Sequence, residues 1–282
     1  MDAVVTGAGC TACGEPAAPA DRYCEACGRP LAATARWSVV PDGVRDETGV
    51  GRVAAVTDRG RSHPRNEDAA AVGAARAGAF AVVCDGVSAT PRAGEAARGA
   101  VAAAAPAVLE ALDAGGSAAD AIVAATRAAQ AAAARLGEPG PDAPSCTFVC
   151  AVSDGREVTV GWVGDSRAYW VPADGAAVPL TVDDAAPERP GALLRWLGAD
   201  AEDTEPRLAR HAPDAAGAVV VCSDGLSRYP AVVAELSRTV AGRGPLVAAR
   251  RLAELAVAAG GHDNITVAVL EHTPAGQGGS AA

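Results

Sequence analysis

Five acidic sites of the sequence stand where apolar, strand-like runs begin or end. Three such runs end in an aspartate that Gly or Ser follows, at Phe80–Gly86, Val158–Ser166 and Val219–Gly225. Asn66-Glu67-Asp68 follows an earlier run, and Gly260–Asn264 precedes the last one. One Asp–Gly pair alone is typical of an ordinary turn. Because a buried strand delivers its last residue to the rim of a sheet, five such sites indicate gathered carboxylates, which would need a cation.

Carboxylate ligands without histidine favour hard cations such as Mg²⁺ or Mn²⁺. Two such ions about 3.5–4 Å apart can share a water, lower its pKa and stabilise an in-line displacement at phosphorus. Gly86 would let a backbone carbonyl approach the same ions. The residues therefore predict metal-assisted hydrolysis, with phosphate esters as the natural substrates.

The elements that must position these residues alternate irregularly between strand and helix. Hydrophobic runs predict strands at Arg52–Thr57, Ala79–Cys84, Thr147–Val152, Val158–Val163, Ala168–Val171, Ala218–Cys222 and Ile265–Leu270. Helices are predicted at Ala93–Leu112, Ala118–Leu136, Ala231–Val240 and Pro245–Ala259. Three of the strands follow one another between 147 and 171. This order favours an α+β fold of layered sheets with helices outside over a doubly wound parallel sheet.

The motifs around the carboxylates resemble the metal-dependent type 2C serine/threonine phosphatases of bacteria. The resemblance runs from about 52 to 270 in the family's order, through Thr57–Gly60, Arg65–Asp68, Val83–Gly86, Val163–Tyr169, Cys222–Leu226 and Gly261–Thr266. It implies a four-layer α-β-β-α sandwich of two antiparallel sheets flanked by helices, with the metals at one edge. It also implies hydrolysis of phosphoserine and phosphothreonine by a water that two metals activate, with protein substrates of Ser/Thr kinases.

The resemblance implies a role for each matching residue. Asp85 would bridge two Mn²⁺ or Mg²⁺ ions, and the Gly86 carbonyl would bind one of them. Asp224 and Asp263 would complete one site, Glu67 and Asp68 would hold the other metal, and Asp165 would join Asp224 at a third, weaker site. Asn264 would orient a water or the phosphate.

The sequence departs from the family at the residue expected to bind phosphate. Where the family has an arginine four residues before the Glu of the Asn-Glu-Asp motif, this chain has His63, with Arg61 and Arg65 on either side. A planar guanidinium suits phosphate, so one of these arginines is expected to take the role, and solvent exposure of both is the alternative. Val87, which directly follows Asp85-Gly86, has no proton to donate to the leaving group. That role is therefore left to His63 or to a metal-activated water.

A separate cysteine cluster lies at the N-terminus. Cys10, Cys13, Cys24 and Cys27 form two Cys-x-x-Cys-Gly turns ten residues apart. Four thiolates in this arrangement fit one structural, tetrahedral Zn²⁺, with disulfides or a redox dithiol as alternatives. Residues 1–31 resemble the short zinc ribbons of bacterial proteins, and the resemblance implies docking to a protein. Residues 32–51 are predicted to be a linker, 52–271 the phosphatase domain and 272–282 a disordered tail.

Composition narrows the function classes further. All 24 basic residues are Arg, so neither a Schiff-base lysine nor a P-loop lysine is present. A net charge of −10 disfavours nucleic acid and anionic membranes as partners. No signal peptide or membrane span is apparent, and the chain is expected to be cytoplasmic. Cys84, Cys146, Cys150 and Cys222 are expected as core thiols, and His211 and His272 as surface residues.

Three other functions share these motifs. A catalytically weak scaffold could bind phosphoproteins and use the ribbon as its working part, although intact Asp85, Asp224 and Asp263 speak against it. A phosphatase acting on small metabolites, or a regulator acting on an anti-sigma-factor antagonist, would use the same metal chemistry.

Overall fold

The computed structural model describes residue 26 and residues 36–140, 142–186, 188–189 and 191–274. The chain divides into two units, Met1–Arg36 and Trp37–Ala282. The predicted zinc ligands Cys10, Cys13, Cys24 and Cys27 lie outside the described residues. The account of the fold therefore concerns the second unit.

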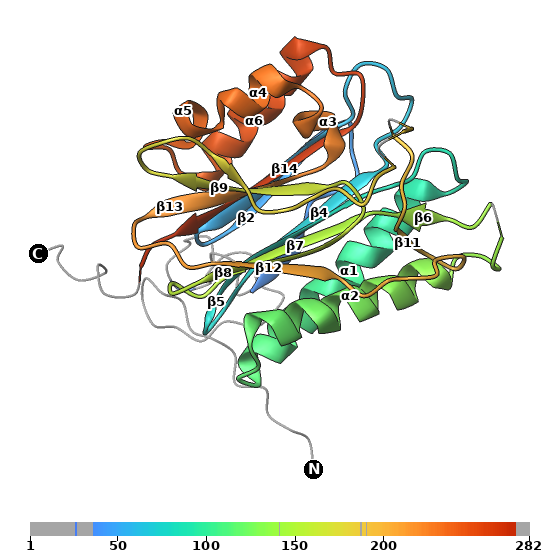
Figure 1. Ribbon diagram of the computed structural model, residues 1–282, viewed down its shortest axis with the longest axis horizontal. Helices are drawn as coiled ribbons and strands as arrows, with labels where there is room; N and C mark the ends of the chain where they lie inside the picture. The colour runs from blue at the N-terminus through green and yellow to red at the C-terminus, as the bar shows by residue number, and fades with distance from the viewer. Residues whose placement is uncertain (1–25, 27–35, 141, 187, 190, 275–282) are drawn as a thin grey trace, which may run out of the picture. The chain divides into compact units, whose positions relative to one another are not determined.

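Two six-stranded sheets form the centre of this unit (Figure 1). The first has the order β1 (Trp37–Val39), β4 (Asp68–Ala75), β5 (Gly78–Asp85), β7 (Phe148–Ser153), β8 (Val158–Val163), β12 (Arg207–His211). The second has the order β10 (Val178–Pro179), β9 (Arg167–Pro172), β13 (Gly217–Cys222), β14 (Ile265–His272), β3 (Val53–Asp58), β2 (Arg45–Val50). The short strands β6 (Ser145–Cys146) and β11 (Leu197–Gly198) form a separate pair. Every pairing between the described strands is antiparallel.

Helices cover the outer face of each sheet. The long pair α1 (Ala93–Asp113) and α2 (Ala118–Ala134) packs on the first sheet, and α3 (Asp224–Ser227), α4 (Pro230–Ala234), α5 (Leu236–Val240) and α6 (Pro245–Ala259) pack on the second. A third hydrophobic core fills the space between the sheets. The strands at the centre of each sheet are buried on both faces, which explains their continuous apolar runs. The α+β sandwich predicted from the sequence is confirmed.

The ends of the helices follow local sequence signals. Ser117 begins α2 with a capping box, because its Oγ accepts from the Asp120 N–H at 3.1 Å and the Asp120 carboxylate accepts from the Ser117 N–H. Pro245 occupies the first turn of α6, where its missing N–H costs nothing. The predicted helix Ala231–Val240 is two short helices that meet at Glu235. None of the helices in the described ranges combines the length and apolarity that a membrane span requires.

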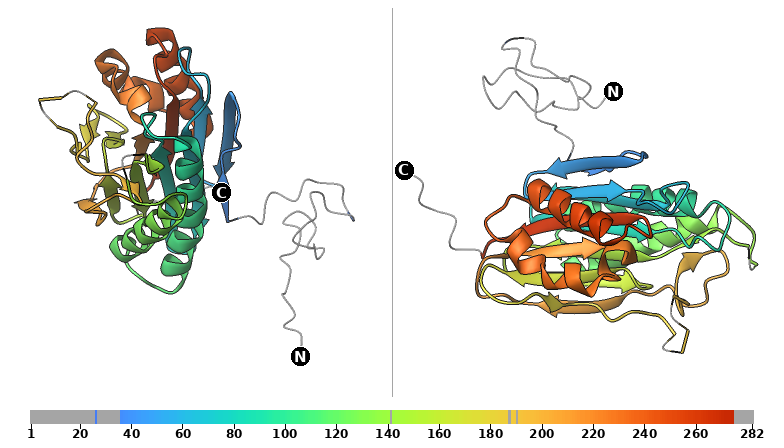
Figure 2. Two further views of the ribbon diagram at one scale, coloured as in Figure 1. Left: turned by 90° about the vertical axis from the view of Figure 1, so that its right-hand side faces the viewer. Right: turned by 90° about the horizontal axis from the view of Figure 1, so that it is seen from above.

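The predicted linker at 32–51 is wrong over most of its length. Trp37–Val39 pairs with β4, and Arg45–Val50 pairs with β3. These strands lie at one edge of the sandwich, one on each sheet (Figure 2). Exposed and half-buried residues alternate along Arg45–Val50, as expected for an edge strand with one wet face. The domain therefore begins at Trp37 instead of residue 52.

The predicted boundary at 272 is also wrong, because β14 continues through His272. His272 pairs with Gly217 of β13 and is 1% exposed, so it is a core residue and not a surface one. Its Nδ1 is 2.8 Å from the Ser153 Oγ. The expected core positions of Cys84, Cys146, Cys150 and Cys222 are confirmed, and all four are free thiols.

Candidate active site

Aspartates from both sheets meet where the strands begin and end, at one end of the sandwich. Asp68, at the start of β4, lies directly opposite Asp85, at the end of β5. Asp165 follows β8, Asp224 follows β13 and Asp263 precedes β14. Antiparallel pairing explains the convergence, because one strand begins at the edge where its neighbour ends.

A cleft of about 230 Å³ opens over these carboxylates. Asp85, Asp165, Asp224 and Asp263 line it together with Arg228. Its other walls come from the turn after β5, from Thr147 and from the segment that contains Gly191 and Leu193. A small, polar cleft of this kind suits a compact anionic group better than a large apolar ligand.

The carboxylates raise one another's pKa values. Burial, followed by the charges of Asp68, Asp224, Asp165 and Asp263, raises the pKa of Asp85 well above its usual range. Burial raises the pKa of Asp68 to about 7, against the opposing hydrogen bond from Ser223. Burial and the charge of Asp224 raise the pKa of Asp165 to about 6. The cluster therefore binds protons, or other cations, more readily than separate aspartates would.

The donor set fits divalent cations. Asp68 Oδ1 and Asp224 Oδ1 are buried oxygens with no hydrogen-bond partner, which a cation would satisfy. The donors are oxygens only, as Mg²⁺ and Mn²⁺ prefer. Among the described residues, no group of three or more acidic, histidine or cysteine side chains is arranged so that it could hold a metal ion. Asp263 instead contacts His63 Nε2 at 3.1 Å and Arg228 Nη1 at 3.1 Å, and a cation would compete with these two partners.

Gly86 and Gly225 allow the loops of the site to approach closely. A Cβ on Gly86 would lie 2.8 Å from the Glu67 carbonyl oxygen and 2.7 Å from the backbone of Ala93. A Cβ on Gly225 would collide with the carbonyl oxygen of Asn264. Because both obstacles are backbone atoms, no side-chain rotation can relieve them. The Gly that follows Asp85 and Asp224 is therefore required by packing.

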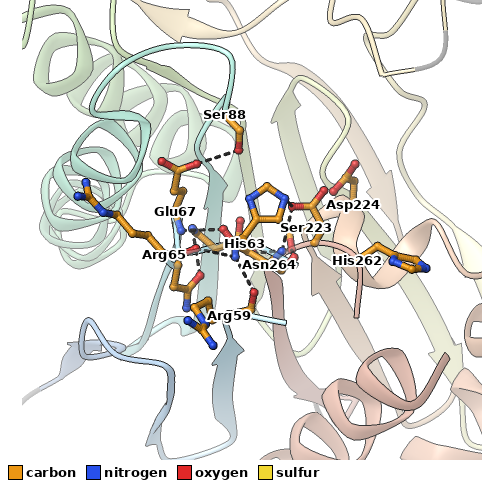
Figure 3. Close-up of polar contacts among 12 residues, drawn as sticks. Arg59, His63, Arg65, Glu67, Ser88, Ser223, Asp224, His262 and Asn264 are labelled. Carbon is orange, nitrogen blue, oxygen red and sulfur yellow. Dashed lines mark hydrogen bonds and ion pairs between the residues drawn. The ribbon is translucent and has the colours of Figure 1, made fainter. Parts of the chain in front are cut away.

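Asn264 joins the loop before β4 to the start of β14 (Figure 3). Its Oδ1 accepts from the Glu67 N–H at 2.8 Å, and its Nδ2 donates to the carbonyls of Arg59 and Arg65 at 2.8 and 3.0 Å. Both amide N–H groups are thus used by backbone. Asn264 was expected to orient a water or the phosphate, and in this geometry it holds the loop that carries Glu67.

Three hydroxyl side chains support the acidic residues. Ser223 Oγ donates to Asp68 Oδ2 at 2.7 Å and accepts from the Thr266 N–H at 3.0 Å. Ser88 Oγ donates to Glu67 Oε2 at 2.8 Å. Thr147 Oγ1 accepts from the Asp85 N–H at 3.0 Å. Ser223 was not predicted, although its place directly before Asp224 in the motif was a usable signal.

The basic residues are arranged differently from the expectation. His63 lies beside Asp263, whereas Arg61 and Arg65 are exposed, and none of the three is among the residues that line the cleft. Arg65 points away from Asp224 (Figure 3). Arg228 contacts Asp224 Oδ2 as well as Asp263, and sequence reasoning missed it. Its helical spacing of four residues from Asp224 was the available signal.

A buried aspartate fastens the segment that contributes Gly191 and Leu193 to the wall of the cleft. The Asp184 side chain is fully buried and forms ion pairs with Arg195 at 3.1 Å and Arg207 at 2.6 Å. The Asp184 N–H donates to the Gly164 carbonyl at 2.9 Å, one residue before Asp165. This contact ties the segment between β10 and β11, which includes Leu193, to the acidic cluster.

Comparisons with known proteins agree with this geometry. The model of a family described as protein phosphatase 2C matches residues 58–255. The catalytic domain of the serine/threonine protein phosphatase PstP, solved with two manganese ions, is 28% identical over 83% of this chain and all of that one, with a TM-score of 0.61. The Mycobacterium tuberculosis phosphatase PstP/Ppp is 30% identical over 79% of this chain and 99% of that one, with a TM-score of 0.62.

A third solved structure, the serine/threonine phosphatase Stp1 from Staphylococcus aureus, shares the fold at 20% identity and a TM-score of 0.65. It covers 79% of this chain and 95% of that one. No curated protein matched the sequence. The matching family model includes four of the five clustered aspartates and ends before Asp263. The chain belongs to the protein phosphatase 2C family of serine/threonine phosphatases, which are hydrolases.

Proposed function

We propose that this chain hydrolyses phosphoserine and phosphothreonine esters in proteins, with two Mn²⁺ or Mg²⁺ ions held by the aspartate cluster. The observation that supports this proposal best is the cluster of Asp85, Asp165, Asp224 and Asp263 around one cleft, with Asp68 directly opposite Asp85 and burial raising the pKa of Asp85. Carboxylates gathered this closely favour bound cations. The manganese ions in the structure of the relative PstP are a second, independent support.

The ligand roles are proposed residue by residue. Asp85 would bridge the two ions, the Gly86 carbonyl would bind one of them, and Asp224 and Asp263 would complete one site. Glu67 and Asp68 would serve the other ion, and Asp165 with Asp224 a third, weaker site. When bound, divalent cations supply the positive charge that activates water and offsets the charge developing on the phosphoryl group.

The chain's own side chains perform the remaining tasks. Ser223 orients the Asp68 carboxylate through the hydrogen bond at 2.7 Å, and Thr147 holds the backbone N–H of Asp85 at 3.0 Å. Asn264 holds the Glu67 loop in place. In hydrolysis the bond between phosphorus and the Ser or Thr oxygen breaks, and that oxygen takes up a proton. His63, partly exposed beside Asp263, is the side chain proposed to donate it.

The N-terminal cysteines carry a separate proposal. Cys10, Cys13, Cys24 and Cys27 would bind one structural Zn²⁺ in a ribbon that docks the enzyme to a partner protein, on the grounds of their spacing alone. Four free cysteines in the described domain favour a reducing compartment, which supports the proposed cytoplasmic location.

The test of the proposed function is release of phosphate from a phosphothreonine peptide by the purified, unmutated chain. We expect turnover with Mn²⁺ and none after treatment with EDTA, with recovery when Mn²⁺ is restored. A phosphorylated sugar assayed in parallel should react more slowly than the peptide. Peptide turnover that persists in EDTA, or a folded, Mn²⁺-loaded protein without turnover, would refute the proposal and favour a phosphoprotein-binding scaffold.

A further inference from the structure

Arg228 brings a positive charge into the acidic cleft. It directly follows the short helix α3 and lies one helical turn after Asp224, so its side chain returns to the same side of the chain. One guanidinium nitrogen contacts Asp224 Oδ2, and another lies 3.1 Å from Asp263 Oδ2. The side chain is 39% exposed and lines the cleft together with Asp85 and Asp165.

The other arginines near the cleft either lie outside its lining or are already paired with a carboxylate. Among the described residues that line the cleft, Arg228 is the only one with a positive charge. Arg61 and Arg65 are exposed outside this lining. Arg167, close to Asp165, forms a bidentate ion pair with Asp183, with Nε donating to Oδ1 at 2.8 Å and Nη2 to Oδ2 at 2.6 Å. Arg228 is therefore the guanidinium that a group inside the cleft would meet.

The present partners of Arg228 are the carboxylates that the proposed function assigns to divalent cations. A cation on Asp224 and Asp263 competes with Arg228 for their oxygens. A guanidinium has five N–H donors in a planar fork, which matches two oxygens of a phosphate group. A phosphate in the cleft would thus offer Arg228 oxygen acceptors in place of the two carboxylates. The phosphate would in turn contact a positive charge in a cleft whose other charged lining residues, among those described, are carboxylates.

We propose that Arg228 binds the phosphate group of the substrate, the role that the sequence pattern assigned to Arg61 or Arg65. The proposal rests on the proposed function, because it presumes a phosphate ester in this cleft. Under this proposal the phosphate-binding residue lies in the segment after β13, and not in the loop before β4 where Arg61 and Arg65 lie. The affinity for substrate and the affinity for inorganic phosphate then both depend on a residue that also contacts Asp224 and Asp263.

The experiment measures binding of inorganic phosphate to the Mn²⁺-loaded full chain by calorimetry, which needs no turnover. Arg228→Ala should weaken phosphate binding roughly 10- to 100-fold, as loss of a charged hydrogen-bond pair does. Arg228→Lys, which keeps the charge without the fork, should fall between Arg228→Ala and wild type. Arg238→Ala, on the exposed face of α5, is the matched control and should bind phosphate as the wild type does.

A second titration, with Mn²⁺ alone, separates phosphate binding from a merely structural role. If Arg228 binds phosphate, Arg228→Ala should keep or increase its affinity for Mn²⁺, because a competing cation is gone. An equal fall in Mn²⁺ and phosphate affinity would overturn the proposal, since Arg228 would then only position Asp224 and Asp263. Loss of phosphate binding in Arg61→Ala or Arg65→Ala, but not in Arg228→Ala, would overturn it as well.

The two proposals fail in different measurements. Failure of the proposed function would appear as missing turnover by the unmutated chain on a phosphothreonine peptide. Failure of the role of Arg228 would appear as unchanged phosphate affinity in Arg228→Ala, whether or not the unmutated chain turns over.

Discussion

Asp85 lies among four other aspartates, and burial, followed by their charges, raises its pKa. Each of these carboxylates lies at or next to the end of a strand, in a motif that the sequence reveals, so the acidic cluster could be predicted. The partners that tune it could not. Ser223 bonds to Asp68 across 155 positions of sequence, and no local pattern announces that contact. The sequence pattern placed the phosphate-binding residue beside His63, at Arg61 or Arg65. Arg228 lies in a different motif, which the pattern did not associate with phosphate.

His272 provides a prediction about pH. Burial lowers the pKa of His272, and its Nε2 has no hydrogen-bond partner. The unfolded chain takes up a proton near pH 6.5, whereas the folded chain resists it. A histidine with a lowered folded pKa therefore adds stability at neutral pH, and this stability is lost as the pH falls below the unfolded pKa of about 6.5.

Urea unfolding of the metal-free protein at pH 7.5 and 5.5 measures this effect. His272→Gln should lose less stability between the two pH values than the wild type does. His262→Gln, at an exposed position, is the control and should behave as the wild type does. Equal pH dependence in His272→Gln and wild type would show that His272 does not titrate as its burial implies.

At the scale of elements, the strands with Val-rich runs were predictable and the others were not. The strand β4 carries Asp68 but consists mainly of Ala, which has low strand propensity, so no strand was expected at Asp68–Ala75. Edge strands β1, β2 and β12 are polar or short, and their identity comes from pairing with central strands. Pairing of this kind is decided by tertiary structure, which a single-sequence pattern does not contain.

The segment between β10 and β11, which lines part of the cleft, gives a prediction at this scale. Asp184→Ala would leave Arg195, which is 12% exposed, without its buried partner. Breaking a buried ion pair by removing one member costs about 3 kcal/mol or more. We expect the free energy of unfolding, measured in urea, to fall by about that amount.

Asp203→Ala is the matched control, because Asp203 contacts the same Arg195 at 2.9 Å but is 64% exposed. An exposed pair contributes about 1 kcal/mol or less, so this variant should be nearly as stable as the wild type. If the two variants lose equal stability, burial of Asp184 does not account for the anchoring of the segment.

At the scale of the whole molecule, a phosphatase domain from Trp37 follows an N-terminal cysteine cluster. The active-site residues named above all lie within the second unit, so catalysis should not require the cysteines. Cys10→Ser combined with Cys13→Ser should release about one zinc per chain by elemental analysis. Hydrolysis of a small aryl phosphate should stay close to that of the wild type.

Cys84→Ser combined with Cys150→Ser, at buried free cysteines of the domain, is the control for zinc content and should leave it unchanged. A loss of aryl phosphate hydrolysis in the Cys10 and Cys13 variant would mean that the N-terminal unit belongs to the catalytic structure. Unchanged zinc content in that variant would contradict the zinc ribbon itself.

The most direct test of the account compares Asp85→Asn with Asp214→Asn, an exposed aspartate in the loop between β12 and β13. The measurement is Mn²⁺-dependent release of phosphate from a phosphothreonine peptide, with Mn²⁺ binding followed by calorimetry. Asp85→Asn should lose detectable turnover and at least one Mn²⁺ site while remaining folded, and Asp214→Asn should keep both. Near-normal turnover and Mn²⁺ binding in Asp85→Asn would contradict the central claim that the aspartate cluster holds the catalytic metals.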